Sequence, residues 1–378
     1  MSKKNYKKSR RYKKMRRRKI IFGIEIAVLL ILSGILFVYA WINRSMDKMN
    51  QDTLDSSQIQ INSEVKANTE LSQMSGTQVI ALVGVDARGV EGSDLAESMN
   101  SDTIILCCID HDNQEIRMVS IMRDTWMNMA KYTDEYYEFD KANSAYNRGG
   151  PESMLSMLNT NLDLALTDYV TVNFKALADA IDVLGGLDIE MSNAECVHAN
   201  NYNREVSEAQ GVEYEAIPYD EDLGDDYTEV RHVSGALATS YARIRYGGGD
   251  DYKRTERQRA VLSAMIAKAQ KSDLKTLNAL INTLFSDIQT SFSNADLLAL
   301  ATNIFNYKLS ETNGFPYEKT AHRYDKVGDV VIPCGLSSNV TALHQFLYAD
   351  MAYTPSDTVK NNSEMITSKT GYREGDGF

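Results

Sequence analysis

Cysteine is scarce in this sequence, and its placement predicts no disulfide framework. The chain has 378 residues, of which only 4 are Cys and 5 are His. Cys107 and Cys108 are adjacent in an apolar run, so we expect them on opposite faces of a strand, packed as small hydrophobic side chains. Cys196 and Cys334 could form a bridge in an oxidising exterior or stay as thiols, and the sequence leaves both readings open. No Cys/His spacing predicts a structural zinc site.

Positive charge is in deficit everywhere except at the N-terminus. Residues 1–19 hold 12 Lys or Arg and no acidic residue, which leaves 28 basic against 52 acidic residues, a net charge of −24, for the rest of the chain. We therefore expect no binding to nucleic acid by this larger part. The basic tail borders an apolar segment, where contact with anionic lipid headgroups is a simpler interpretation than a nucleic-acid patch.

Long apolar runs are absent, with the exception of residues 20–42. This segment has 23 residues and one charge, Glu25. As a helix it would cross a hydrocarbon core of about 30 Å. The run exceeds the apolar part of a typical signal peptide, and no clean small-x-small cleavage site follows it. With the basic residues in front, the pattern predicts a single-pass signal anchor, with the N-terminus in the cytoplasm and the remainder outside the cell.

The sequence shows no internal repeat and no second independent domain. It divides into five predicted segments: a basic cytoplasmic tail (1–19), a transmembrane helix (20–42), a polar stalk (43–77), an extracellular domain (78–350) and a polar C-terminal tail (351–378).

Strand and helix patterns alternate within the extracellular domain. Residues 103–110 and 115–122 flank the turn residues HDN and predict a hairpin of buried strands. Helical periodicity follows at 234–242 and 251–271. We predict a mixed α/β/α sandwich with helices on the sheet faces. Residues 193–230 are acidic, rich in Tyr and without clear periodicity, so we expect an irregular surface insertion there.

Arginines stand out against the acidic background because most lie at the ends of predicted elements. They are Arg88, Arg123, Arg243, Arg245, Arg254 and Arg257. Several guanidinium groups that converge at strand ends would bind phosphate, because each guanidinium can donate two parallel hydrogen bonds to two phosphate oxygens. Arg254 and Arg257 also share a face near a helix N-terminus, where backbone N–H groups favour anions. For any one of these arginines, an ordinary surface salt bridge is the alternative.

Acidic residues accompany the arginines. Asp86 ends one predicted strand and Asp102 begins the next, so a hairpin would bring both carboxylates to a Mg²⁺ site, with Mn²⁺ as an alternative. Asp124 directly follows Arg123, and Asp251 precedes Arg254. Taken singly, each is a candidate turn or cap residue.

Eight segments, taken in order, resemble the LytR-CpsA-Psr (LCP) family of bacterial envelope proteins. They are GVDAR (84–88), SDTIIL (101–106), VSIMRDT (119–125), KANSAYNRGG (141–150), YVTVNF (169–174), LGGLDI (184–189), YARIRY (241–246) and GDDYKRTERQRAVL (249–262). The resemblance covers about residues 78–271. It implies an LCP-type catalytic domain that uses Mg²⁺ to move a glycopolymer, such as teichoic acid or capsular polysaccharide, from polyprenyl pyrophosphate to peptidoglycan.

The resemblance also implies roles for individual residues. Asp86 and Asp102 would hold the metal. The catalytic set would be Arg88, Arg123, Asp124, Arg245, Arg254 and Arg257, and the shell around the pyrophosphate would be Lys141, Asn143, Tyr146, Arg243, Asp251 and Gln258. Two departures from the family pattern, Met122 in place of Pro and Ser234 in place of Asn or Asp, remove no charged group.

Other readings stay open at this point. The same site would permit a hydrolase that releases the glycan if water replaced the sugar hydroxyl, and a non-enzymatic envelope regulator would not need the charged residues. Asp102 and Asp124 are both candidate general bases. Val261, Leu262 and Met265 either line an apolar groove for the prenyl chain or belong to the core.

Overall fold

The computed structural model describes most of the chain beyond residue 49. The described residues are 50–51, 54, 56–67, 76–85, 100–130, 138–245, 250–285, 288–293, 296, 306–348 and 352–378. They belong to one compact unit, Met49–Phe378, and the predicted cytoplasmic tail and membrane helix lie outside them. Among the residues just given, no helix combines the length and apolar character that a membrane crossing requires.

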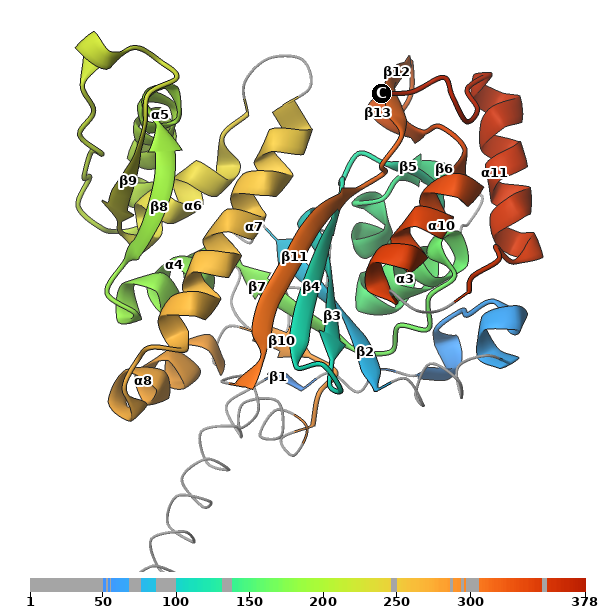
Figure 1. Cartoon of the computed structure of the whole chain (residues 1–378), viewed down its shortest axis with the longest axis horizontal. Helices are drawn as coiled ribbons and strands as arrows, with labels where there is room; N and C mark the ends of the chain where they lie inside the picture. The colour runs from blue at the N-terminus through green and yellow to red at the C-terminus, as the bar shows by residue number, and fades with distance from the viewer. Residues whose placement is uncertain are drawn as a thin grey trace, which may run out of the picture. The chain divides into compact units, whose positions relative to one another are not determined.

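A seven-stranded mixed sheet organises this unit, in the order β1-β10-β7-β2-β3-β4-β11 (Figure 1). Its antiparallel centre is β2, β3 and β4, which confirms the predicted hairpin; β7 lies parallel to β2, and β11 lies parallel to β4. The strands are β1 (Asn50–Gln51), β2 (Thr77–Val85), β3 (Ser101–Asp110), β4 (Glu115–Ile121), β7 (Tyr169–Asn173), β10 (Ile288–Thr290) and β11 (Lys308–Phe315).

Each sheet face has its own apolar cluster, because side chains alternate along a strand. Ile104, Leu106 and Cys108 pack under α3 (Ser144–Leu162), α10 (Leu336–Leu347) and α11 (Asp357–Thr370). The opposite face carries Cys107, so the two adjacent cysteines do lie on opposite faces as predicted. That face lies toward α7 (Asp250–Ala269) (Figure 1). We call its apolar residues the α7-side cluster: Ile80, Ile105, Cys107, Ile109, Ile116, Met118, Phe292 and Tyr307, with Leu82, Val170, Leu262 and Leu309 packed against them.

A third cluster joins α7 to a smaller group of elements: α4 (Phe174–Val183), β8 (Leu187–Ser192), α5 (Asn193–Gln210), β9 (Thr228–Val233), α6 (Gly235–Arg243) and α8 (Leu274–Phe285). Helix α6 begins at Gly235, where a Cβ would lie 2.0 Å from the Ala178 carbonyl oxygen, so glycine permits the close approach of α4. Val261 and Met265 belong to this third cluster, whereas Leu262 packs against the sheet.

The prediction of an irregular insertion at 193–230 is wrong in its first half. Helix α5 begins with a capping box, in which Ser192 and Glu195 each bond the other's backbone N–H, and it ends at Gly211 with φ 70°. Its buried side, with Cys196, Ala199 and Val206, is built mainly from small residues. A stripe of small side chains gives a weak hydrophobic periodicity, which is why the sequence did not reveal the helix.

Parts of both predicted flanking segments pack onto the domain. Within the predicted stalk, β1 pairs with β10, Ile59 is buried in the core, and Asn62 donates to Asp163 at 2.6 Å. Within the predicted C-terminal tail, α11 buries Val359 and Ile366. The three remaining small sheets are β5 (Trp126–Asn128) with β6 (Phe139–Lys141), β12 (Lys319–Tyr324) with β13 (Gly328–Pro333), and β8 with β9.

Helix α10 holds a buried histidine, His344. The Nε2 of His344 lies 2.8 Å from the Leu162 carbonyl oxygen, and the ring stacks on Tyr353 at 3.7 Å between centroids. Burial lowers the pKa of His344, although the Leu162 carbonyl and Asp163 act in the opposite direction.

All four cysteines are free and buried, so Cys196 and Cys334 are thiols.

We expect the free energy of unfolding to fall as the pH drops from about 7.5 to 5.5, because the unfolded state takes up a proton on His344 near its ordinary pKa of about 6.5, before the folded state does. The loss from this group is at most about 1.4 kcal/mol per pH unit. Urea unfolding of the wild type and His344→Gln at several pH values measures it. A stability difference between the two proteins that does not vary with pH would contradict the assignment.

Candidate functional site

The turn after β4 presents two charged residues in a fixed backbone geometry. The Met122 N–H donates to the Phe315 carbonyl at 2.9 Å, the Asn143 N–H to the Arg123 carbonyl at 3.0 Å, and the Val331 N–H to the Asp124 carbonyl at 2.9 Å. These bonds tie the turn to β11, to the start of α3 and to β13. Proline, which the family pattern has at position 122, could not make the first of these bonds because it lacks an N–H.

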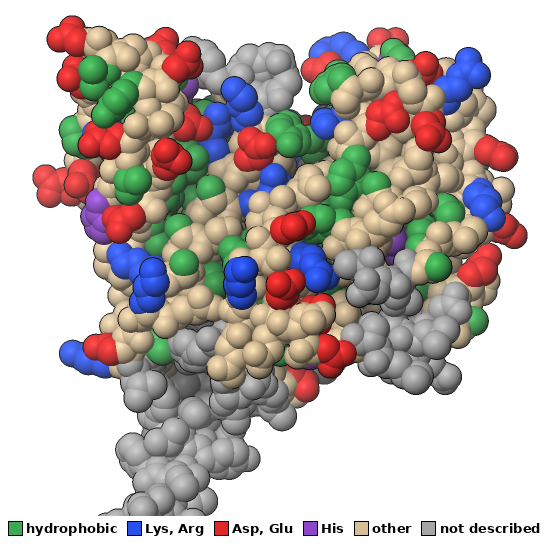
Figure 2. Space-filling view, in the orientation of Figure 1, with side chains coloured by type: hydrophobic (Ala, Val, Ile, Leu, Met, Phe, Trp, Pro, Cys, Tyr) green, Lys and Arg blue, Asp and Glu red, His purple; other side chains and the backbone are tan. Residues whose placement is uncertain are grey.

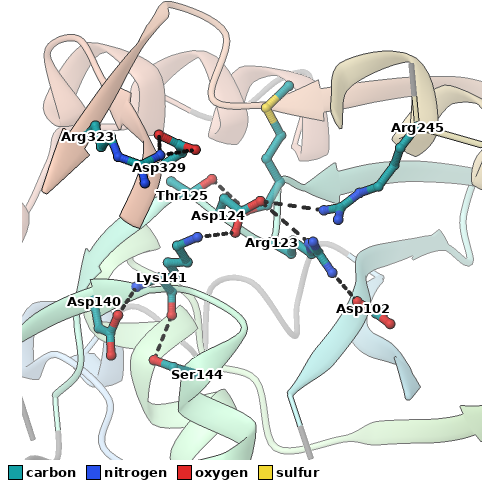
Figure 3. Close-up of polar contacts among 11 residues, drawn as sticks. Asp102, Arg123, Asp124, Thr125, Asp140, Lys141, Ser144, Arg245, Arg323 and Asp329 are labelled. Atoms are coloured by element: carbon teal, nitrogen blue, oxygen red, sulfur yellow. Dashed lines mark hydrogen bonds and ion pairs between the residues drawn. The ribbon is translucent and has the colours of Figure 1, made fainter. Parts of the chain in front are cut away.

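Asp124 gathers cations from three separate segments (Figure 3). Lys141, at the end of β6, places its Nζ 3.0 Å from Asp124 Oδ1, and Arg245, after α6, places Nη2 3.9 Å from Oδ2. The Nε of Arg123 lies 3.5 Å from Oδ2, and the same guanidinium pairs with Asp102 on β3. We call these five residues the Asp124 cluster.

The Asp124 cluster is open to ligands. Its side chains range from 18% exposed for Arg123 to 45% for Arg245. Figure 2 shows basic side chains in the region between the part of the molecule that holds α5 and β9 and the part that holds β12 and β13. Acidic side chains lie on the surface of the part that holds α5 and β9, on one side of this region. The Asp124 cluster itself combines three cations with two carboxylates, a net charge of +1, which favours an anionic ligand on an otherwise acidic domain.

Helix α7 carries further residues that were predicted for the site, and they are buried. Arg254 is 4% exposed and Gln258 is 8% exposed. Arg257 directs its Nε to Glu195 on α5 at 2.8 Å and its Nη1 to the Ile244 carbonyl at 3.1 Å. In this structure Arg257 therefore links α7 to α5 and to the end of α6, a contact that the sequence did not indicate.

The other residues predicted for the site have different surroundings. Arg243 lies over the ring of Phe174, with Cζ 5.7 Å from the centroid. Tyr146 is fully buried, and its hydroxyl lies 3.1 Å from Thr171 Oγ1 on β7 and 3.4 Å from Gln289 Oε1 on β10. Asn143 is buried and contributes backbone bonds on both sides, to Arg123 and to Ser101.

Three of the predicted site residues are only partly covered by the structure or lie beyond it. Asp251 falls in the first turn of α7, and its side chain lies outside the described atoms. Asp86 and Arg88 lie outside the described residues, so their predicted roles stay predictions. Sequence reasoning missed Glu195, although the spacing of Ser192 and Glu195 is the S-x-x-E signature of a capping box.

A divalent cation fits the described part of the site through Asp102. Among the described residues, no group of three or more His, Cys, Asp or Glu side chains could enclose a metal. Mg²⁺ in phosphate-binding sites needs only one or two carboxylates, because water and phosphate oxygens complete its shell. Asp102 is 28% exposed and pairs with Arg123 through one oxygen, Oδ1, which leaves Oδ2 accessible for such a role.

The contact between Arg257 and Glu195 offers a test of what Arg257 does. We expect Glu195→Gln to lower the free energy of unfolding by about 3 kcal/mol, because a buried guanidinium loses its counter-ion. The single acceptor oxygen of glutamine can still take the Ser192 N–H of the capping box, so the change removes the charge and the hydrogen bond to Arg257 together. Urea unfolding measures it, with Asp329→Asn, which breaks an exposed pair with Arg323, as the matched control. Equal stability of both variants would show that the Arg257 pair is not a structural link.

Residues 36–320 match the sequence model of the LytR_cpsA_psr family. The chain is 25% identical over 286 residues to the polyisoprenyl-teichoic acid–peptidoglycan teichoic acid transferase TagU of Enterococcus faecalis, a match that covers 75% of this chain and 81% of that protein.

Two solved structures share the fold. TagV of Bacillus subtilis superposes with a TM-score of 0.54 at 20% identity, covering 74% of this chain and 99% of that one. Protein gbs0355 of Streptococcus agalactiae superposes with a TM-score of 0.57 at 19% identity, covering 76% and 93%. These likenesses show the mixed α/β fold that the sequence predicted.

Proposed function

This chain belongs to the LytR_cpsA_psr family, and from that premise we propose that it is a membrane-anchored phosphotransferase that moves a glycopolymer from polyprenyl pyrophosphate to peptidoglycan. The polymer would be of the teichoic acid or capsular polysaccharide type. The names of relatives such as TagU support the reaction class. Residues 20–42 would anchor the protein in the bilayer, with residues 1–19 in the cytoplasm and the described domain outside the cell.

The observation that carries the proposal is the convergence of Arg123, Lys141 and Arg245 on Asp124. A lone surface arginine has little meaning, but three cations brought from separate segments and held by one carboxylate form a preorganised receptor. Guanidinium groups bind two phosphate oxygens at once, and the lysine adds a point charge. A pyrophosphate is the ligand for which this density of positive charge is suited.

The reaction needs positioning and charge neutralisation more than covalent chemistry. A hydroxyl oxygen of peptidoglycan forms a new bond to the glycan-side phosphorus. The bond from that phosphorus to the bridging oxygen breaks, and the polyprenyl monophosphate leaves with the electron pair. The hydroxyl proton passes to a base or to solvent, so the products are a phosphodiester on peptidoglycan and the lipid monophosphate.

Residues of this chain would divide the work of this step. The Asp124 cluster would orient the phosphate and offset its charge as the transition state forms. A bound Mg²⁺, held by Asp102 and Asp86, would supply further neutralisation of the phosphate oxygens; Mn²⁺ is the alternative ion. Both oxygens of Asp124 face cations and Asp102 is assigned to the metal, so the group that takes the hydroxyl proton stays open between these carboxylates and solvent.

The proposal is tested with the purified full chain in detergent, Mg²⁺, a polyprenyl pyrophosphate whose glycan is labelled, and peptidoglycan fragments. We expect the label to become covalently attached to peptidoglycan. Label released as free glycan or glycan phosphate would instead establish a hydrolase. Intact donor that remains bound, with donors of several sugar compositions, would leave a carrier-binding protein and would reject the enzyme.

A further inference from the structure

The sheet face under α7 changes from apolar to polar along β4. Met118 lies opposite Cys107 and belongs to the α7-side cluster. Two residues further along the same face, Ser120 lies opposite Ile105 on one side and Gly314 of β11 on the other. Arg123 follows three residues later. The face thus passes from hydrophobic side chains to a serine and a glycine, and β4 then ends in the turn that carries Arg123 and Asp124.

Arg259 of α7 extends toward this polar step. It is 4% exposed, and a Cβ built on Gly314 would lie 3.7 Å from its Nη1 and 3.6 Å from Tyr252 Cε2. Tyr252 and Arg259 are seven residues apart, so they share the face of α7 that looks onto β11 (Figure 1). Glycine at 314 leaves the space in front of the guanidinium without a side chain.

Two guanidinium nitrogens of Arg259 lack an acceptor inside the described part of the protein. Its Nε and Nη1 are buried and bond to no acceptor there, and the buried hydroxyl of Ser120, 1% exposed, is in the same condition. Burial lowers the pKa of Arg259, while Glu256 and Tyr252 act in the opposite direction. Buried N–H groups without acceptors are costly for folding, so these two nitrogens call for a ligand that supplies the missing acceptors.

The location of these two donors indicates the chemistry of that ligand. One end of the site borders the α7-side cluster, which includes Leu262 of α7 itself. Toward the other end, β4 leads into the turn that carries Arg123, three residues after Ser120. A suitable ligand carries an anionic group directly attached to a long apolar chain, with further negative charge on the opposite side.

We propose that Arg259 and Ser120 bind the phosphate that is joined directly to the polyprenyl chain, while the Asp124 cluster binds the phosphate on the glycan side. This assignment rests on the proposed function and divides its pyrophosphate between two sets of residues. Arg259 then holds the group that leaves as polyprenyl monophosphate. It stabilises the negative charge that develops on the leaving phosphate oxygen as the bond to the glycan-side phosphorus breaks.

The test is Arg259→Met, which keeps the length of the side chain and removes its charge. Farnesyl phosphate, farnesyl diphosphate and farnesol are titrated into the full chain by calorimetry, and Tm is measured without ligand. We expect the wild type to bind farnesyl phosphate more tightly than farnesol. Arg259→Met should bind farnesyl phosphate about tenfold more weakly or worse, since a charge-assisted contact is lost, yet unfold at the same Tm as the wild type or higher.

Two further variants separate this site from its neighbours. Arg123→Ala should lose the preference for farnesyl diphosphate over farnesyl phosphate, whereas Arg259→Met should retain part of it. Arg323→Met removes an exposed arginine that pairs with Asp329 at 2.9 Å, and it should bind all three ligands like the wild type.

Unchanged binding of farnesyl phosphate to Arg259→Met would overturn the proposal. If that variant unfolds early, Ser120→Ala decides: weaker binding of farnesyl phosphate supports the site, and wild-type binding rejects it. A wild type that binds farnesyl phosphate through Arg259 but transfers no glycan would support the lipid-phosphate site and reject the transferase. If Arg259→Met transfers glycan and binds farnesyl phosphate like the wild type, the transferase is supported and the lipid-phosphate site is rejected.

Discussion

Arg123→Ala is expected to lower kcat/KM for glycan transfer by roughly 10³-fold without unfolding the domain. Removal of one preorganised donor to a developing oxyanion costs about 10²–10³-fold, and Arg123 also bridges Asp102 and Asp124. The turn should survive, because its backbone bonds to Asn143, Val331 and Phe315 do not involve the arginine side chain. Transfer of labelled glycan to peptidoglycan measures the effect.

The controls for this prediction distinguish charge from geometry. Arg123→Lys keeps a positive charge but loses the planar fork, so it should fall between the wild type and alanine. Arg323→Ala, at an exposed pair on β12, should transfer glycan at the wild-type rate. Activity of Arg123→Ala within threefold of the wild type would remove the Asp124 cluster from the reaction.

Removal of the divalent cation is expected to have an effect of similar size. We expect chelation to reduce transfer at least about 10²-fold, because neutralisation of the pyrophosphate by the metal is lost. Asp102→Asn should raise the Mg²⁺ concentration for half-maximal activity by about tenfold, since an amide oxygen is a weaker ligand for a hard cation than a carboxylate. A titration of transfer rate against Mg²⁺ gives both values.

Asp124→Asn is the matched variant for this titration. This substitution changes shape and charge in the same way as Asp102→Asn. In the structure, however, the Asp124 oxygens face the cations Lys141, Arg123 and Arg245. It should therefore lower the rate of transfer while leaving the Mg²⁺ midpoint close to that of the wild type. Transfer that continues undiminished in chelator, or an equal shift of the midpoint in both variants, would contradict a metal site at Asp102.

Local sequence patterns predicted the parts of the fold that depend on local periodicity. The hairpin of β3 and β4 follows from apolar runs around a turn, and the placement of Arg123 and Asp124 just after a strand follows from the end of such a run. Helices α6 and α7 begin and end within about two residues of their predicted bounds. These features depend on residues that are close together in the sequence.

Features that depend on distant packing could not be predicted in this way. The partner of Arg257 is 62 residues away, and the partners of the Tyr146 hydroxyl lie on β7 and β10. The sequence analysis assigned no role to Arg259, and arginine is mostly exposed in proteins. Its burial follows from the position of α7 against β11, and only the three-dimensional structure reveals that its guanidinium faces a glycine.

The division of one pyrophosphate between the Asp124 cluster and Arg259 also explains why these two sites differ in exposure. The Asp124 cluster is partly exposed, which suits the end of the substrate that must meet a large acceptor. Arg259 is buried next to the α7-side cluster, which suits the end that carries the lipid. A site of this form would hold the leaving group in place while the glycan-side phosphate remains accessible to the peptidoglycan hydroxyl.

The most direct measurement follows each phosphate separately. The full chain is incubated with Mg²⁺, peptidoglycan and a donor that carries ³²P either in the glycan-side or in the lipid-side phosphate. Phosphoryl transfer predicts that the glycan-side label becomes attached to peptidoglycan and that the lipid-side label stays extractable as polyprenyl monophosphate. Glycan attached to peptidoglycan with both labels left on the lipid, or no attachment at all with release of free glycan phosphate, would contradict it.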